Sequence, residues 1–353
     1  MAMKSSLLQA ALFSGLSCVV DETNCLADPS ITTLVELANC FNYYTVQKDY
    51  YSQETYFTAQ PNTTQLDSWG DLITSLLYVD NNCTSVAIPP SLQDTYTISD
   101  FDSYCVLSEI RANERGFYDK GWGLFVVPSS RSGTKRNIHL GMPHPLFDFR
   151  TPAQAVSLFT MTGAKSLLIS GRHRSAYNAS TDCLPSTAKA TYYRTDPTHD
   201  VNEPFHSASR AVWAWQNVNG GCPTRSCAFI QLHGKSPTTC RTDQIFLSSG
   251  LGNSTWYADD VDRPVKRIQR ELEHSFPNWN ISLPSDSSCV LTATNNVFGR
   301  LINGVDESKI CNQAATLDGS TGVFVHIEQA RVATSQDAYD GWGRALLVAF
   351  EPA

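Results

Sequence analysis

The pattern of apolar and polar positions changes character near residue 120. Before that point, apolar residues recur at helical spacing over residues 31–44, where Ser30 is placed as an N-cap, and again over residues 65–78. After it, short apolar runs alternate with amphipathic stretches, which is typical of strands connected by helices. Strands are predicted at residues 123–128, 137–143, 166–174, 228–234, 244–250, 289–296, 322–329 and 344–352, and helices at residues 152–164, 203–217 and 261–276.

This pattern predicts an α/β fold with a mixed central sheet of about eight strands and helices on both faces. The first two predicted strands are expected to form a hairpin across residues 129–136. We divide the chain into a possible signal peptide or first helix (1–20), a helical N-terminal cap region (21–115) and a main α/β domain (116–353). Beyond the first segment, no run approaches about 18 apolar residues, so no transmembrane helix is expected.

Composition indicates an extracellular protein and argues against nucleic-acid binding. The chain has a net charge of -8 and a pI near 5.5, without a long run of basic residues. Ten of its eleven cysteines form an even set once Cys18 is set aside, and we expect about five disulfides; scattered buried thiols are the alternative. N-glycans are expected at five Asn-x-Ser/Thr sites, at Asn62, Asn82, Asn178, Asn253 and Asn280.

The stretch NIHLGMPHPLFDFRT (137–151) carries the strongest chemical signal. His144 and Asp148 lie four residues apart at the end of a predicted strand, and flanking prolines hold the segment extended. A third ligand, His233, ends the run CAFIQLHG, where Gly234 permits close approach. Two imidazoles and one carboxylate suit a catalytic zinc ion. We therefore predict one Zn²⁺ at these three residues; the alternative is that His144 caps a turn and His233 is a core histidine.

Further residues could act beside this metal. Glu328 ends the run GVFVHIEQ and is predicted to be the general base, unless it merely pairs with Arg331. Arg174, in the loop GRHRSAYN (171–178), could hold a substrate carboxylate or an oxyanion, although a basic surface loop is equally compatible. The remaining candidates for substrate contact or for orienting a ligand are Arg172, His173, Asp196, His199, Asn295 and Arg300.

The loop at residues 196–206 is the main competitor for metal binding. His199 and Glu203 are four residues apart and could share a helical face, but Pro204 indicates that the helix begins only there, which separates them. The chain contains neither a glycine-rich phosphate loop nor a G-x-S-x-G nucleophile turn. Nucleotide-dependent and serine-hydrolase chemistry therefore have little support.

The succession PHPLFD, SGRHR, FIQLHG and FVHIEQ resembles the zinc carboxypeptidase-like superfamily over roughly residues 120–350, especially its N-formylglutamate amidohydrolase and poly-gamma-glutamate hydrolase branches. The resemblance implies His144, Asp148 and His233 as zinc ligands, Glu328 as base and Arg174 as a clamp for the substrate carboxylate. Zinc carboxypeptidases use H-x-x-E, whereas the spacing here is one residue longer and the acid is aspartate. The cysteine-rich N-terminal third has no counterpart in the family.

These observations favour a secreted zinc-dependent hydrolase of an amide or peptide-like bond, acting on a small-molecule or peptide substrate that carries a carboxylate. Two alternatives stay open. The same fold could serve a non-catalytic secreted protein that binds glycans or peptides, or a metal-dependent phosphoesterase. Fold analogy alone does not decide among them.

Overall fold

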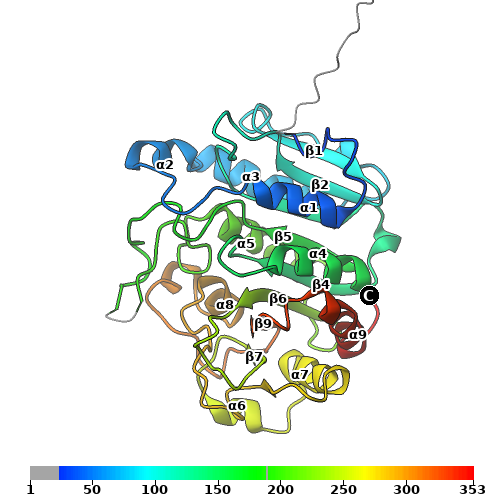
Figure 1. Cartoon of the computed structure of the whole chain (residues 1–353), viewed down its shortest axis with the longest axis vertical. Helices are drawn as coiled ribbons and strands as arrows, with labels where there is room; N and C mark the ends of the chain where they lie inside the picture. Colours follow the sequence, from blue (N-terminus) through cyan, green and yellow to red (C-terminus); the bar gives the residue numbers. More distant parts are fainter. Residues whose placement is uncertain (1–23, 188–189) are drawn as a thin grey trace, which may run out of the picture.

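A computed structural model describes residues 24–187 and 190–353 (Figure 1). The possible signal peptide or first helix and Cys18 lie outside the described residues. The described chain folds around one mixed sheet of nine strands. In order across the sheet, they are β1 (Tyr96–Phe101), β2 (Tyr104–Glu109), β3 (Leu124–Pro128), β5 (Ala164–Ile169), β4 (Arg136–Met142), β6 (Cys227–Gly234), β9 (Phe324–Gln329), β7 (Ile245–Ser248) and β8 (Ile281–Ser282).

The four central strands run parallel, and the flanking strands give the sheet its mixed character. β5, β4, β6 and β9 are parallel neighbours, whereas β1, β2, β3 and β5 pair antiparallel and β7 runs antiparallel to β9. The expected hairpin between residues 123–128 and 137–143 is wrong, because β5 lies between β3 and β4 and pairs with both. Parallel strands buried on both faces are apolar throughout, so their sequences do not reveal which neighbour they choose.

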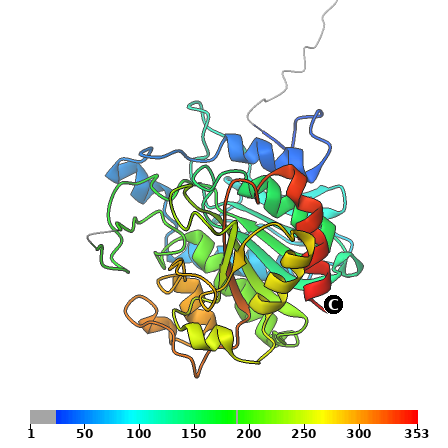
Figure 2. The same ribbon diagram turned by 60° about the horizontal axis from the view of Figure 1, so that its bottom comes forward.

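Helices cover both faces of the sheet, as the sequence predicted (Figures 1 and 2). One layer contains α1 (Leu34–Tyr43), α4 (Thr151–Thr162), α9 (Tyr339–Ala349) and α7 (Pro264–Ser275); the other contains α3 (Thr63–Leu76), α5 (Pro204–Val218) and α8 (Val297–Ile302). The short helices α2 (Gln53–Ala59) and α6 (Ser254–Ala258) complete the set in the part of the chain that is described. The prediction of an α/β fold is therefore confirmed.

Period-two alternation assigns each strand side chain to one of the two layers. On β6, Ala228, Ile230 and Leu232 pack in the core beneath α4 and α9, whereas Phe229 packs in the core beneath α3 and α5. His233 lies an even number of positions from Phe229 and therefore on the same face of β6. The same alternation on β9 puts His326 and Glu328 on the side of Phe324, away from Val325 and Ile327. The polar residues at the strand ends therefore emerge together on the α5 face.

Several segments differ from the sequence prediction. Residues 344–352 are not a strand, because buried Trp342, Ala345, Leu346 and Ala349 recur at helical spacing and residues 344–349 belong to α9. Residues 289–296 form an irregular wall and no strand. Strands β1 and β2 were missed, since polar residues interrupt both and β1 is a partly exposed edge strand. The first helix is capped by Thr33 and not by Ser30.

The expectation of about five disulfides is confirmed, and such a number suggests an extracellular protein. The pairs are Cys25–Cys40, Cys83–Cys105, Cys183–Cys311, Cys222–Cys227 and Cys240–Cys289. Across residues 24–187 and 190–353, every helix is too short or too polar to cross a membrane.

Candidate metal centre and active-site cleft

The candidate site lies at the edge where the carboxyl ends of the parallel strands meet. His144 follows β4, Arg174 lies in the loop after β5, His233 is the penultimate residue of β6, and Glu328 is near the end of β9. Because these strands are parallel, their carboxyl ends share one edge of the sheet, where ligands of α/β proteins collect. His233 and Glu328 are direct register partners on β6 and β9, so the strand pairing itself sets them side by side.

The loop between β4 and α4 turns Asp148 back toward His144. Leu146 and Arg150, two residues to either side of Asp148, both adopt left-handed backbone conformations with φ near 64°. The Asp148 N–H donates to the His144 carbonyl at 2.9 Å, and the Thr151 hydroxyl donates to the Asp148 carbonyl at 2.8 Å. Left-handed conformations are costly for non-glycine residues and often occur at functional sites, where the surrounding structure maintains them.

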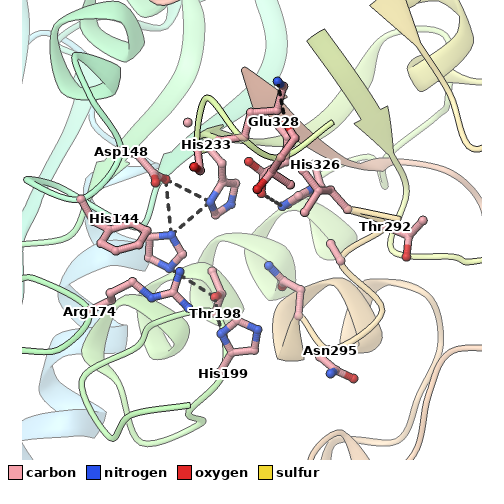
Figure 3. A pocket seen from close by; sticks show the side chains of 18 of the residues that line it. His144, Asp148, Arg174, Thr198, His199, His233, Thr292, Asn295, His326 and Glu328 are labelled. Atoms are coloured by element: carbon pink, nitrogen blue, oxygen red, sulfur yellow. Dashed lines mark hydrogen bonds and ion pairs between the residues drawn. The ribbon is translucent and has the colours of Figure 1, made fainter. Parts of the chain in front are cut away.

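Three ligand atoms converge at this point (Figure 3). Asp148 Oδ2 lies 3.3 Å from His144 Nδ1 and 3.2 Å from His233 Nδ1, and the two Nδ1 atoms are 3.2 Å apart. A tetrahedral ion with bonds of about 2.0–2.1 Å needs ligand atoms about 3.3 Å apart. The triangle therefore has the size of one face of a zinc tetrahedron, and its fourth corner is free for water or substrate.

The electrostatics of the cluster also suit a cation. All three residues are buried, and burial lowers the pKa of His233 to about 4, which keeps its ring neutral and its lone pair available. Burial alone would raise the pKa of Asp148, but contact with the two imidazoles holds this pKa well below its usual range. A shared metal ion would bind both facing imidazole nitrogens and the carboxylate oxygen at once. The three ligand atoms therefore fit the predicted zinc ion.

Asp196 orients His144 from behind. Its Oδ1 lies 3.1 Å from His144 Nε2 and accepts from the Thr198 hydroxyl at 2.8 Å. Its Oδ2 accepts from the Arg174 guanidinium and lies 3.0 Å from His199 Nδ1. Burial would raise the pKa of Asp196, but the Arg174 guanidinium and the contacts with His199 and His144 hold it well below its usual range. A carboxylate on the far ring nitrogen fixes the tautomer of a metal-binding histidine, and it directs Nδ1 of His144 into the cluster.

Glu328 lies beside the ligand cluster in a setting that favours its protonated form. Burial, reinforced by the negative charge of Asp148, raises the pKa of Glu328 to about 8. Its carboxyl lies 3.5 Å from His326 Nε2, whose pKa burial lowers well below the usual range, and within the described residues it makes no ion pair with Arg331. His233, His326 and Glu328 form a second group whose ligand atoms lie close together. Sequence reasoning did not assign a role to His326, although its parity with Glu328 in FVHIEQ places both on one face.

A cleft of about 360 Å³ opens over these residues. Besides the ligands and Glu328, it is lined by Arg174, His199 and Asn295, all three of which the sequence singled out, and by Lys235, which it did not. Residues 290–296 form the opposite wall (Figure 3), which the Cys240–Cys289 disulfide ties to the loop after β6. The Asn295 amide donates to the Tyr192 hydroxyl at 2.9 Å, so part of this wall is held in place.

Three of the remaining candidates lie outside the lining of this cleft. Arg172 is completely buried and bonds both carboxylate oxygens of Glu203. Arg300 is engaged by the carbonyls of Thr294 and Ile310 and by the Asn295 side chain. The His173 ring accepts a hydrogen bond from the Ser175 N–H at 3.0 Å. These contacts give the three side chains supporting positions around the cleft.

Comparisons with known proteins give no family assignment. No family model and no curated protein matches the chain. Among solved structures, the chain is similar to a gene product of Agrobacterium tumefaciens, with 14% identity over 62% of this chain and 86% of that one and a TM-score of 0.32. It is also similar to a candidate metallopeptidase of Shewanella denitrificans, with 9% identity over 82% of this chain and 87% of that one and a TM-score of 0.27. Neither TM-score is high enough to support an argument about fold or function.

Proposed function

We propose that this protein is a secreted, zinc-dependent hydrolase of an amide or peptide-like bond in a substrate that carries a carboxylate. The observation that carries the proposal is the triangle of His144, Asp148 and His233 ligand atoms, 3.2 to 3.3 Å on each side, with the buried carboxyl of Glu328 next to it. Two nitrogens and one oxygen favour zinc over calcium or magnesium, which prefer sets of oxygen ligands. When bound, zinc supplies Lewis-acid polarisation of the scissile carbonyl and acidifies water.

Glu328 acts as the general base in this proposal. Its carboxylate takes a proton from the attacking water and, as a carboxylic acid, returns that proton to the leaving nitrogen. The positive charge of a bound cation would lower the pKa of Glu328 from about 8 toward neutral pH, where a group can both accept and release a proton. The register pairing with His233 keeps the carboxyl beside the ligand cluster without relying on a flexible loop.

Arg174 places the substrate. Its guanidinium is partly exposed, lies at the cleft, and is held by Asp196. A guanidinium has five donors, so one pairing leaves others to bind a substrate carboxylate or the oxyanion that develops during acyl transfer. The proposal assigns Arg174 this contact, and Asn295 and His199 the neighbouring walls.

Secretion is the setting we propose for this chemistry. Five disulfides are characteristic of proteins that fold in an oxidising compartment. The asparagines of all five glycosylation motifs are solvent-exposed, so each could carry an N-glycan without disturbing the core. Endoglycosidase treatment of protein secreted by a eukaryotic host should lower its apparent mass.

The test is a metal analysis combined with a substrate panel. Glu328→Gln should retain one zinc per chain, measured by plasma mass spectrometry, and lose turnover of N-acyl amino acids or short peptides. His233→Ala should lose both zinc and turnover. Wild-type protein without stoichiometric metal would instead indicate a binding protein, and turnover confined to a phosphoester panel would indicate a phosphoesterase. Full activity in Glu328→Gln would exclude Glu328 as the base.

A further inference from the structure

The two histidines of the candidate metal site differ in what their far ring nitrogens contact. The far nitrogen of His144, Nε2, lies 3.1 Å from the Asp196 carboxylate. The far nitrogen of His233, also Nε2, is buried and has no hydrogen-bond partner among the residues that the structure describes. A metal-binding histidine almost always engages its far nitrogen with a carboxylate, a carbonyl or water. His233 therefore lacks the contact that His144 has on this side of its ring.

Two further candidate ligands lie beside the His233 ring. Figure 3 shows His326 and Glu328 on the opposite side of His233 from His144 and Asp148. The ring centroids of His233 and His326 are 4.5 Å apart, and His326 Nε2 lies 3.5 Å from the Glu328 carboxyl. The other ring nitrogen of His326, Nδ1, is buried without a hydrogen-bond partner in the described chain. Two unpartnered imidazole nitrogens and a carboxyl are thus gathered next to the first cluster.

The pairing of β6 with β9 holds these three side chains together. His326 and Glu328 are two residues apart on β9, so the alternation of a strand brings both to one face. Glu328 is the register partner of His233 on β6, which adds the third side chain to that face. One ligand atom from each residue lies within 4.8 Å of those of the other two. All three ligands therefore come from paired strands and not from loops.

This second group has the donors and the access that a metal ion needs. Two imidazoles and a carboxylate are donors that zinc accepts, and imidazole also suits copper. Burial lowers the pKa of His326 well below its usual range, so its ring is neutral and offers a lone pair. His233, His326 and Glu328 all line the cleft of about 360 Å³, so an ion can reach them and water can complete its coordination.

We propose that His233, His326 and Glu328 form a second metal site, which binds a divalent cation such as Zn²⁺ or Cu²⁺ and shares His233 with the first site. His233 binds the first ion through Nδ1 and the second through Nε2. Its imidazole releases the Nε2 proton to solvent when the second ion binds, and it then bridges the two ions as an imidazolate. The position of the first ion rests on the proposed function.

The second site gives Glu328 two alternative states. With the second site empty, its carboxyl can exchange a proton with water, as the proposed function requires. With the second site filled, the carboxylate is a ligand and no longer takes up that proton. The chain with one ion and the chain with two ions therefore differ in the group available for proton transfer.

The test counts metal ions in the full-length protein and does not depend on turnover. After dialysis against increasing concentrations of Zn²⁺, plasma mass spectrometry should find two ions per wild-type chain, the second bound more weakly. His326→Gln should bind only the first ion, because an amide is not among the usual ligands of zinc. Glu328→Gln should also keep the first ion and lose the second. Far-UV circular dichroism shows whether each variant is folded.

His274→Gln is the matched control for adventitious binding. His274 is an exposed histidine on α7 that does not line the cleft, so this variant should still bind two ions. A single ion in wild type at every zinc concentration would overturn the second site. A second ion that remains in both His326→Gln and Glu328→Gln would overturn it as well.

The shared imidazole is tested with Cu²⁺ and electron paramagnetic resonance. Two Cu²⁺ ions joined through His233 couple their electron spins, so wild type with two ions should lose most of its signal. His326→Gln with one Cu²⁺ should give the ordinary signal of an isolated ion. Two ions with full, uncoupled signal in wild type would overturn the bridge.

Failure of the proposed function gives a different result from failure of the second site. Wild-type protein that binds two coupled ions but hydrolyses no substrate would contradict the hydrolase and leave the second site standing. Wild-type protein that hydrolyses N-acyl amino acids and binds one ion at every zinc concentration would do the reverse.

Discussion

Arg172 and Arg174 lie two residues apart in the loop after β5, and each pairs with a buried carboxylate. Arg172 is completely buried and donates to both oxygens of Glu203, at 3.1 and 2.5 Å. The Arg174 side chain is 20% exposed, pairs with Asp196 and lies at the cleft. Residue type and partner type are nearly the same, yet the two pairs differ in exposure and in surroundings.

The difference lies in what else each carboxylate contacts. Glu203 is the N-cap residue of α5, and the Arg172 guanidinium lies 6.0 Å from the centroid of the Tyr56 ring, so this pair joins the β5 loop to α5 and to the N-terminal region. Asp196 contacts His144, one of the three candidate metal ligands. Burial would disfavour the charge of Arg172, but the facing carboxylate outweighs this and raises the pKa of Arg172. Burial also raises the pKa of Glu203, to about 7, although the Arg172 charge opposes this rise. A buried ion pair therefore does not by itself identify a functional site.

The largest effect is expected for Glu203→Gln. The substitution leaves the Arg172 charge buried without a counter-ion, which costs about 3–5 kcal/mol of unfolding free energy. Urea unfolding followed by tryptophan fluorescence measures the loss, and zinc content of the folded fraction should be unchanged. Glu203→Leu combined with Arg172→Met is the control, because removing both charges should restore much of the stability. A loss below 1 kcal/mol in the single variant would show that the pair is not structural.

Arg174→Met should behave in the opposite way. We expect a 10²- to 10³-fold loss of kcat/KM, the size seen when one oxyanion donor is removed. Stability should fall by less than half of the Glu203→Gln loss, since Asp196 retains His144, His199 and Thr198 as partners. Kinetics on the substrate panel and the same urea titration provide both values. Equal stability losses at the two positions would remove the distinction between Arg172 and Arg174.

The local pattern could not separate these two arginines, because SGRHR places both in one basic loop and the partners come from a distant segment. Only the family resemblance assigned the substrate clamp to Arg174. It did identify His144, Asp148 and His233, since each lies at the end of an apolar run and the ends of parallel strands meet. Their convergence depends on sheet order, which the sequence misjudged for β3 and β4. The three predicted ligands thus lie together in the structure although the local topology was predicted incorrectly.

Other differences have a similar physical origin. Arg300 lies in a polar stretch of the sequence, where a charged residue is as compatible with substrate contact as with hydrogen bonds to backbone carbonyls. In the structure it donates to backbone carbonyls. Phe147 and Phe149 lie between ligand residues and prolines, and their exposure follows from the left-handed turns of that loop. Lys235 follows His233 and Gly234, but no periodic pattern of apolar and polar residues marks its position. Such positions depend on tertiary packing and could not be predicted from local pattern.

Glu109 extends the comparison to a buried carboxyl that forms no ion pair with any residue the structure describes. It accepts from the backbone N–H groups of Lys120 and Gly121, both at 2.9 Å, and burial raises its pKa to about 7. The folded state then keeps its proton while the unfolded state loses it above pH about 4.5, so stability should fall by up to about 3 kcal/mol as pH rises from 4.5 to 7.

Glu109→Gln tests this sign, because glutamine stays neutral at every pH. Urea unfolding of both proteins at pH 4.5 and pH 7.5 gives the difference in stability at each value. Wild type should lose stability relative to the variant as pH rises. A stability difference between wild type and variant that stays constant across this pH range would show that the Glu109 carboxyl is ionised in the folded protein. Backbone N–H donors would then stabilise the charge of Glu109 as effectively as Arg172 stabilises that of Glu203.

The smallest effect is expected for Asp196→Asn, which changes the charge behind His144 but keeps an oxygen that can accept its Nε2–H. Loss of the charge weakens the ligand, and we expect zinc affinity to fall about 10- to 100-fold, measured by competition with a chelator. Asp200→Asn is the matched control: Asp200 is equally buried but accepts from Thr181 and from the Asn202 N–H, away from the ligands. Equal zinc affinity in both variants would show that the Asp196–Arg174 pair, like Glu203–Arg172, stabilises the fold and does not support the candidate metal site. The two arginines would then differ only in their exposure.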